Sequence, residues 1–569
     1  MSVLAWPLTL IGLVAMYGWA RWLLHDADDP PGAILIGTTT LALSGGALSL
    51  AMLWPGLVGF PVDWRIAALI AAPLALAGWI MWRRGRPRTA VMRRHTAGER
   101  DPLRLVVWGV VIAICALIVF NAAYWPFSID DSLSIYAWFG KHIARSGALP
   151  VGDLYETYPM AVPLLYAFSH QAAGWIDEGL ARLIPALFAV GSIGAAYALG
   201  SALYDTGVGR LAALLMALAP MVTHWASTGY VDLPAGFGFG MSAVFLARLA
   251  RGGGWRDALL AGLMAGLAAW IKNSGLLIVP SVALWLAYRW TIGGEPLRRV
   301  AGQGLLIGLA FAAVAGPWYA RNLIMAGALV PPTGWTWLAE RTLANLFPYL
   351  VDSRYGLIGV AFAAGIVLTL WRALRTRGRA LAPALLVILY APFFAAWWAF
   401  VSYDGRFLLA LTPLAAVMGA SALRTAGAWA EGILGGRWRA AIRVGIAVVI
   451  AALALPAASA ALDFKGALLR DPFMPLEVRH HLTLGSRYVM ARRLAALPPG
   501  SRVWVSDALL PYHADGVSVT VGGRPAPEQI AAYDYWVLNP GEPLPAWFGD
   551  DTPIAEAGGF RLYRVPPPS

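Results

Sequence analysis

The sequence predicts an α-helical polytopic membrane protein of about 14 transmembrane helices with a small C-terminal α/β domain. Of the 569 residues, 59% are hydrophobic and 13% are charged, and the mean hydropathy is +0.63. A soluble chain of this length could not bury so much apolar surface. Many of the 27 tryptophans stand at the ends of apolar runs, as expected for indole rings at the bilayer interface. After residue 463 the composition changes to short β-rich runs between Pro and Gly clusters, which predicts the separate α/β domain.

Apolar stretches of about 20 residues predict the individual helices. The first stretch has no basic leader and no small-residue cleavage site, so we expect a retained helix and not a signal peptide. The lone cysteine, Cys115, lies inside an apolar run and predicts no disulfide framework. The predicted helices lie near residues 3–24, 33–54, 65–83, 104–125, 178–203, 209–226, 233–250, 256–271, 275–290, 300–318, 355–372, 381–401, 406–424 and 440–462.

Arginine-rich loops predict the orientation of these helices. The loop at 84–103 is strongly basic and is therefore expected on the cytoplasmic side. Alternation from that loop places four further Arg-rich loops on the same side, at 248–256, 289–299, 371–379 and 424–443. The same alternation places outside the segments 126–177, 227–232, 319–354, 402–406 and everything after about 463. Since these loops also account for the net charge of +12, we expect membrane lipids as neighbours and no nucleic-acid partner.

Two adjacent aspartates open the first outer loop, in the stretch SIDDSLSIYAWFGK. Residues 131–146 are predicted to form a short helix lying flat on the membrane, with Lys141 on its polar face. A capping role at the N-terminus of this helix accounts for one aspartate. The second, at the outer exit of a membrane helix, suggests a carboxylate that accepts a proton from a hydroxyl or amine nucleophile. The candidate catalytic residues are therefore Asp130 and Asp131.

Further charged residues fall on the same predicted face. Asp232 begins a helix, where an N-cap is the structural alternative. Each cation taken alone is compatible with an interfacial anchor. Together they suit a lipid-linked phosphate, because cations hold an anionic leaving group while a carboxylate activates the nucleophile. The other members of this set are Lys272, Arg321, Asp404 and Arg406.

The stretch YETYPMAVPLLYAF (155–168) predicts a re-entrant or interfacial element above the site, with a plain loop as the alternative. No metal-ligand spacing, phosphate-binding glycine loop or nucleophile elbow is recognisable. We therefore expect no metal or other cofactor, and a donor that reaches the site on a lipid.

From about residue 104 to the C-terminus the chain resembles GT-C superfamily membrane glycosyltransferases, in the branch related to protein O-mannosyltransferases and lipid A aminoarabinose transferase. The resemblance rests on the order of the motifs IDDSLSIYAWFGKHIARSGALP, YETYPMAVPLLYAF, GYVDLPAGFGFG, AAWIKNSGLLIVP, PWYARN and DGRFLLALTP. It implies transfer of a sugar from a polyprenyl-phosphate carrier, usually with inversion and without a nucleotide sugar. It also implies that Asp131 is the catalytic base, with Asp130 as the close alternative, and it matches Asp232 to an aspartate that opens a later helix.

The sequence departs from this family at one position. Aminoarabinose transferases carry a Lys-Pro-Pro segment whose lysine meets the carrier phosphate, whereas this chain has Thr157-Tyr158-Pro159. The resemblance then implies that another cation meets the phosphate and that Tyr158 belongs to the substrate site. The candidates for that cation are Lys141, Lys272, Arg321 and Arg406.

The sequence thus predicts three parts: additional N-terminal helices at 1–84, a GT-C-like catalytic domain at 104–462, and an extracytoplasmic α/β domain at 463–569. We expect a glycosyltransferase of the bacterial inner membrane that uses a polyprenyl-phosphate sugar and a glycan, lipid or protein acceptor. A transporter or flippase of lipid-linked glycans is the alternative, disfavoured because no inverted repeat is evident and the ionisable residues gather at the outer boundary. A non-catalytic scaffold is a third possibility.

Overall fold

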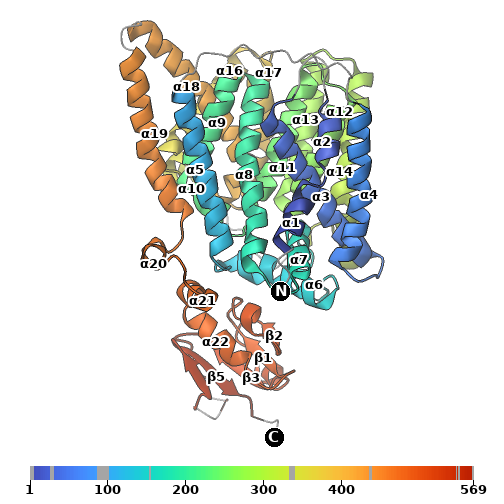
Figure 1. Cartoon of the computed structure of the whole chain (residues 1–569), viewed down its shortest axis with the longest axis vertical. Coiled ribbons are helices and arrows are strands. Elements are labelled where there is room, and N and C mark those ends of the chain that lie inside the picture. Colours follow the sequence, from blue (N-terminus) through green and yellow to red (C-terminus); the bar gives the residue numbers. More distant parts are fainter. Residues whose placement is uncertain are drawn as a thin grey trace.

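The chain folds into a bundle of membrane-length helices with a small mixed domain at one end (Figure 1). The computed structural model describes residues 5–25, 31–85, 102–152, 155–331, 340–434, 439–545, 548 and 552–566.

Four N-terminal helices pack on the bundle and share its core. The predicted helix at 3–24 is broken in two, and α3 contacts α1, α2 and α4. Trp270 donates its indole N–H to the hydroxyl of Ser49 at 2.9 Å, which ties α3 to the central helices. The bounds are α1 (Ala5–Val14), α2 (Tyr17–Leu23), α3 (Ala33–Leu57) and α4 (Trp64–Arg84).

The central helices form the rest of the bundle and contain every remaining predicted helix. Their bounds are α5 (Pro102–Tyr124), α6 (Trp138–Ser146), α7 (Ala161–Ala173), α8 (Glu178–Leu203), α9 (Thr206–Leu218), α10 (Pro220–Ala226), α11 (Asp232–Ala250), α12 (Trp255–Ile271), α13 (Ile278–Thr291), α14 (Leu297–Ala326), α15 (Pro348–Val351), α16 (Gly356–Arg375), α17 (Leu381–Phe400), α18 (Thr412–Leu434) and α19 (Arg439–Ala461). Shorter turns join them at η1 (Ser132–Ala137), η2 (Asn273–Leu277), η3 (Ala344–Leu346), η4 (Ser353–Tyr355) and η5 (Gly405–Leu411).

The predicted count of about 14 spans is not confirmed. By length and composition, 10 helices of the described residues can cross a membrane, or 11 if the pair α9 and α10, bent by 69°, counts as one. The three other predicted spans are helical but short. The first is broken between α1 and α2, α12 has 17 residues and α13 has 14, against the roughly 20 that a span requires.

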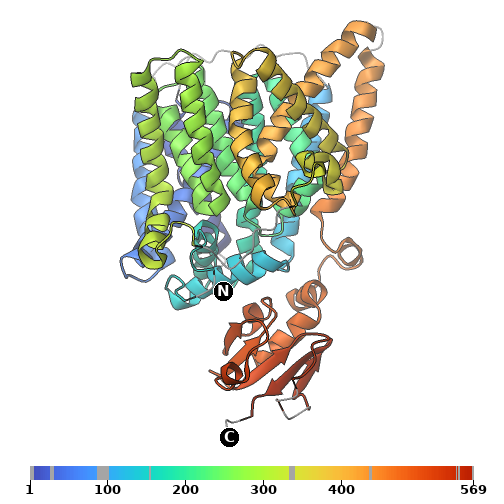
Figure 2. The ribbon, with the colours of Figure 1, turned by 180° about the vertical axis from the view of Figure 1, so that it is seen from behind.

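The loops sort to two ends of the bundle as the arginine pattern predicts. Figures 1 and 2 show α6, α7 and the C-terminal domain at one end and the α16–α17 connection at the other. The predicted outer segments meet at the first end, where Arg406 lies 3.5 Å from Asp131. Which end faces the cytoplasm stays a prediction.

The helix predicted over 131–146 is two elements, a π-helix (η1) followed by α6. The hydroxyls of Ser132 and Ser134 donate to the carbonyls of Ile129 and Asp130, which competes with regular α-helical hydrogen bonds in this turn. Helix α6 then packs closely on α7, because a Cβ on Gly140 would stand 2.6 Å from Tyr166 Cβ.

The segment expected to be a re-entrant element or a plain loop contains a buried helix, α7. Twelve of its 13 residues are buried. The turn before α7 carries Tyr158 and Pro159. The alternative interpretation of residues 155–168 as a plain loop is therefore wrong.

The C-terminal domain is a five-stranded mixed sheet with helices, as the sequence predicts. The strand order is β2-β1-β3-β5-β4, with β1 parallel to β2 and β3, and β5 antiparallel to β3 and β4. Four of the strands coincide with the predicted β-rich runs, and β4 was not predicted. The bounds are α20 (Lys465–Arg470), α21 (Leu476–Leu484), α22 (Ser486–Leu494), β1 (Arg502–Val505), η7 (Pro511–His513), β2 (Ser518–Val521), α23 (Pro527–Ile530), β3 (Tyr535–Leu538), β4 (Ala555–Ala557) and β5 (Phe560–Arg564).

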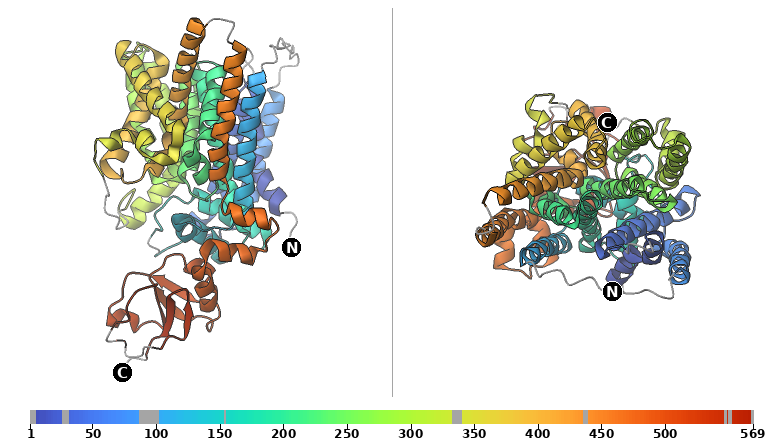
Figure 3. Two further views of the ribbon diagram at one scale, coloured as in Figure 1. Left: turned by 90° about the vertical axis from the view of Figure 1, so that its left-hand side faces the viewer. Right: turned by 90° about the horizontal axis from the view of Figure 1, so that it is seen from above.

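Both faces of this sheet are covered. One face packs Val503, Val505 and Val537 against α22, and the other buries Trp536 and Tyr563. The left view of Figure 3 shows the domain below the helical bundle. It meets α6 where Lys141 donates to the carbonyl of Tyr512 in η7, and it meets α8 where His480 of α21 lies 3.0 Å from Glu178. The C-terminal domain is therefore docked on the end of the bundle that carries Asp131.

Candidate active site

The carboxylate of Asp131 faces a cation and does not cap a helix. Among the described residues, η1 has no side-chain capping bond from Asp131. One carboxylate oxygen instead lies 3.5 Å from a guanidinium nitrogen of Arg406, and the Asp131 side chain is 34% exposed. Its backbone N–H donates to the hydroxyl of Tyr230 at 3.2 Å. The capping explanation of the sequence therefore fails for Asp131.

Arg406 is held between aromatic rings and carboxylates. Its guanidinium carbon lies 4.5 Å from the ring centre of Tyr230 and 5.1 Å from that of Trp225. Asp404 caps η5 by accepting the Arg406 N–H at 2.9 Å and also faces the guanidinium at 3.9 Å. Within the described part of the chain, the buried Nε of Arg406 has no hydrogen-bond partner. A charged donor is thus fixed in place with one N–H unused.

A second ion pair joins Lys272 and Asp232, 2.5 Å apart, beside the first. Lys272 directly follows α12, and its ammonium lies 4.9 Å from the ring centre of Phe407. Asp232 is the first residue of α11, and the N-cap is Val231. The N-cap alternative for Asp232 is therefore wrong, because its buried carboxylate binds the lysine.

A small cavity of about 100 Å³ opens next to this pair. Tyr136 from η1, Tyr158 from the turn before α7 and Lys272 all line it. The structure thus places Tyr158 beside a candidate phosphate-binding cation. The remaining lining residues are Pro159, Ile271, Asn273 and Ser274.

The electrostatics of this cluster favour a proton-accepting carboxylate. Burial raises the pKa of the Asp131 carboxyl above its ordinary value, and the negative charges of Asp232 and Asp130 add to the rise. Arg406 and Lys272 oppose it. A carboxylate with a raised pKa is a stronger base than a free one.

Three of the candidates lie elsewhere or face other partners. The side chain of Lys141 is buried against Asp515 of the C-terminal domain, 2.6 Å away. Arg321 donates to the carbonyls of Pro150 and Glu156 at 3.1 Å each and so holds the turn that carries Tyr158. Asp130 is exposed.

The comparisons with known proteins bear on this arrangement. A family model described as dolichyl-phosphate-mannose-protein mannosyltransferase matches residues 157–318. No curated protein sequence matches the chain.

Solved structures resemble most of the chain. ArnT from Cupriavidus metallidurans in the apo state is similar with a TM-score of 0.59 and 15% identity, over 80% of this chain and 98% of that one. The same protein bound to undecaprenyl phosphate gives a TM-score of 0.57, 15% identity and the same coverage. AglB, an oligosaccharyltransferase from Archaeoglobus fulgidus in complex with an inhibitory peptide and a dolichol-phosphate, gives 0.51 and 14% identity, over 76% of this chain and 69% of that one.

The chain has a GT-C fold. The resemblance to GT-C membrane glycosyltransferases is confirmed, and the chain is a multi-span membrane protein.

The residues that hold the loop of Asp130 and Asp131 in place were not identified from the sequence. Buried Arg182 donates to the carbonyls of Pro126 and Ser227 and lies 3.6 Å from Asp463. Arg354 binds Asp404 at 2.7 Å. Arg182 lies within the predicted helix at 178–203. An arginine inside a membrane span is rare, and this signal in the sequence could have identified Arg182 as a candidate.

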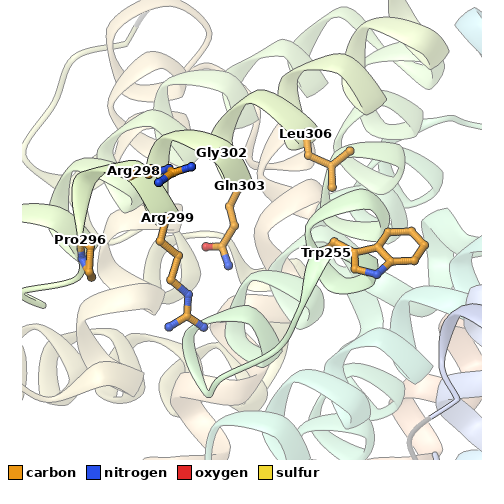
Figure 4. Close-up of a pocket in the computed structure, with 7 residues that line it drawn as sticks. All are labelled: Trp255, Pro296, Arg298, Arg299, Gly302, Gln303 and Leu306. Carbon is orange, nitrogen blue, oxygen red and sulfur yellow. The ribbon is translucent and has the colours of Figure 1, made fainter.

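A different cavity of about 470 Å³ lies at the opposite end of the GT-C bundle (Figure 4). Trp255, at its edge, is the first residue of α12, whereas Lys272 follows the last, so the two cavities are separated by the length of that helix. A helix of 17 residues is about 25 Å long. None of the candidate site residues lines this cavity. Its lining residues are Trp255, Pro296, Arg298, Arg299, Gly302, Gln303 and Leu306.

Proposed function

We propose that this protein is an integral-membrane glycosyltransferase that takes a sugar from a polyprenyl-phosphate donor on the outer face of the bacterial inner membrane. The observation that carries the proposal is the Asp131–Arg406 pair. A carboxylate of raised pKa stands 3.5 Å from a guanidinium whose buried Nε makes no hydrogen bond to the described residues. The acceptor is a hydroxyl or amine of a glycan, a lipid or a protein.

In this mechanism Asp131 removes the proton of the acceptor as its oxygen or nitrogen attacks the anomeric carbon of the sugar. The bond between that carbon and the phosphate oxygen breaks, and the electron pair leaves with the polyprenyl phosphate. Arg406 and Lys272 bind the phosphate and stabilise its growing charge, because a guanidinium and an ammonium form charge-assisted hydrogen bonds with phosphate oxygens. The proton on Asp131 then returns to solvent.

The other charged residues position these groups. Asp404 orients Arg406, since it accepts the backbone N–H and also faces the side chain. Asp232 holds the ammonium of Lys272, which lines the cavity, in an ion pair of 2.5 Å. Arg321 supports the turn that carries Tyr158, and Tyr158 lines the donor cavity where the family carries its lysine motif.

Two of the similar structures support this donor class. One is ArnT bound to undecaprenyl phosphate, and the other is AglB in complex with a dolichol-phosphate. We place the end of the bundle that carries Asp131 in the periplasm, because the arginine pattern predicts that the C-terminal domain docked on it lies outside.

Binding of undecaprenyl phosphate to the purified protein tests the phosphate site without knowledge of the sugar. We expect Arg406→Gln and Lys272→Gln each to weaken binding by roughly tenfold or more, since a charge-assisted bond contributes about 1.5–3 kcal/mol. Arg299→Gln, at the opposite end of the bundle, is the matched control and should bind as the wild type does. Equal binding by all four proteins would refute the assigned phosphate site.

Turnover separates the transferase from the alternatives. Incubated with a panel of polyprenyl-phosphate sugars, a transferase releases polyprenyl phosphate and a flippase or a scaffold does not. Wild-type protein that binds the carrier but releases none of it from any donor and acceptor mixture would contradict the proposed chemistry.

A further inference from the structure

A cluster of metal-binding side chains lies where the C-terminal domain meets the membrane helices. It consists of Glu178, the first residue of α8, together with His480 of α21 and His513 at the end of η7. One ligand atom from each residue lies within 4.8 Å of the others. Glu178 and His480 are 302 positions apart, so the short ligand spacings that were sought in the sequence could not have detected this group.

The geometry of the cluster is compact. An oxygen of Glu178 lies 3.0 Å from Nε2 of His480, and the two imidazole ring centres are 4.7 Å apart. The second oxygen of Glu178 accepts the backbone N–H of Phe127 at 2.8 Å, which fixes the carboxylate. Glu178 and His480 are each 6% exposed.

A plain ion pair between Glu178 and His480 leaves part of this cluster unexplained. Nδ1 of His480 and Nε2 of His513 are buried and have no hydrogen-bond partner among the residues that the structure describes. Buried imidazole nitrogens are normally satisfied, and an unsatisfied pair indicates a bound species. Glu178, His480 and His513 each bring one ligand atom into a group that spans no more than 4.8 Å, as the binding of a cation requires.

The donor set identifies the kind of cation. Two imidazole nitrogens and one carboxylate oxygen are typical ligands of zinc, and three protein ligands leave a fourth position open. Lys141, a positive charge that also acts on this cluster, is paired with Asp515 at 2.6 Å.

We propose that Glu178, His480 and His513 bind a zinc ion that fastens the C-terminal domain to the membrane domain. Two of the ligands come from the C-terminal domain and one from α8, so the ion bridges the two parts. Through Glu178 the bridge also reaches Phe127, four residues before Asp131. The site therefore links docking of the C-terminal domain to the loop that carries the candidate base, although zinc binding itself does not depend on the proposed transferase activity.

Metal content of the purified full-length protein tests this site directly. The protein is purified with a tag that contains no histidine, stripped with a chelator, reloaded with Zn²⁺ or Co²⁺ and desalted. We expect one equivalent of zinc per chain, and with Co²⁺ the visible absorption bands of a tetrahedral ion. The variants His513→Gln and Glu178→Gln should bind zinc at least 10- to 100-fold more weakly, the range that loss of even an outer-shell partner gives.

His481→Gln is the matched control, because His481 is an exposed neighbour of His480 in the same helix. It should bind zinc as the wild type does. Hydrogen exchange of residues 476–485 and 510–515 in the wild type, with zinc and with chelator, supplies a readout that needs no variant to fold. Protection that increases with zinc supports the bridge. Wild-type protein that takes up no zinc or cobalt, unchanged zinc affinity in His513→Gln, or exchange that is identical with zinc and with chelator would each overturn it.

Discussion

Replacing Asp131 by asparagine separates a catalytic role from a structural one. The change keeps the size of the side chain and its ability to accept a hydrogen bond, but it removes the charge and the basicity. The structural cost is small, because no capping bond of η1 is lost. In the 3.5 Å ion pair with Arg406, the side chain of Asp131 is 34% exposed. A partly solvated pair of this kind contributes about 1 kcal/mol or less to the free energy of unfolding.

The catalytic cost should be much larger. Loss of a general base lowers turnover by roughly 10²-fold to 10⁴-fold, and a hundredfold loss corresponds to about 2.7 kcal/mol of activation free energy. The assay is release of polyprenyl phosphate from a sugar-loaded carrier, with thermal unfolding of the same preparation measured alongside. Asp130→Asn is the control, since Asp130 is exposed and should lose little activity. An Asp131→Asn enzyme that unfolds normally and retains full turnover would refute the assignment of Asp131 as the base.

Three further predictions concern the charge of Asp130, the ion pairs of Asp515 and the orientation of the chain in the membrane. Asp130→Asn removes a negative charge that raises the pKa of Asp131, and because the base must be ionised, the acidic limb of the rate profile should move to lower pH. A shift to higher pH would contradict this. Asp515→Asn removes the partner that Lys141 and Arg145 share at 2.6 and 2.5 Å. The C-terminal domain should then be cleaved faster by protease, with Asp507→Asn, which pairs with Arg487 inside that domain, as the control. An impermeant thiol reagent should label Glu556→Cys but not Arg298→Cys in spheroplasts, and the reverse pattern would invert the predicted topology.

Much of the fold was predictable because its signals are local. The length of an apolar stretch predicts a helix, and arginine-rich loops predict one end of the bundle. Both are properties of short segments and do not depend on distant contacts. The span count failed because α12 and α13 are helical but short. The strand β4, three residues long, was too brief to give a pattern.

The site was predictable only in part, because its residues are distant in sequence. The aspartates and cations were found, and the structure brings Asp131, Arg406, Lys272 and Asp232 together. Lys141 was predicted on the polar face of a helix, but its side chain is buried against Asp515. Amphipathic spacing cannot show that this face meets a domain more than 300 residues later in the sequence. Tyr230 accepts a hydrogen bond from Asp131, and Arg182 donates one to Ser227. These contacts join distant residues, so no local sequence pattern predicts them.

The contacts of Lys141, Arg145 and Glu178 with the C-terminal domain have a consequence for protein engineering. Glu178 meets His480, and Tyr512 packs its ring 6.4 Å from that of Phe127. The loop at 126–177, with Glu178 after it, and the C-terminal domain therefore form one exchangeable unit. A chimera that grafts the C-terminal domain of another enzyme onto these helices has to carry the matching loop with it, or the graft will meet a surface of unpaired charges.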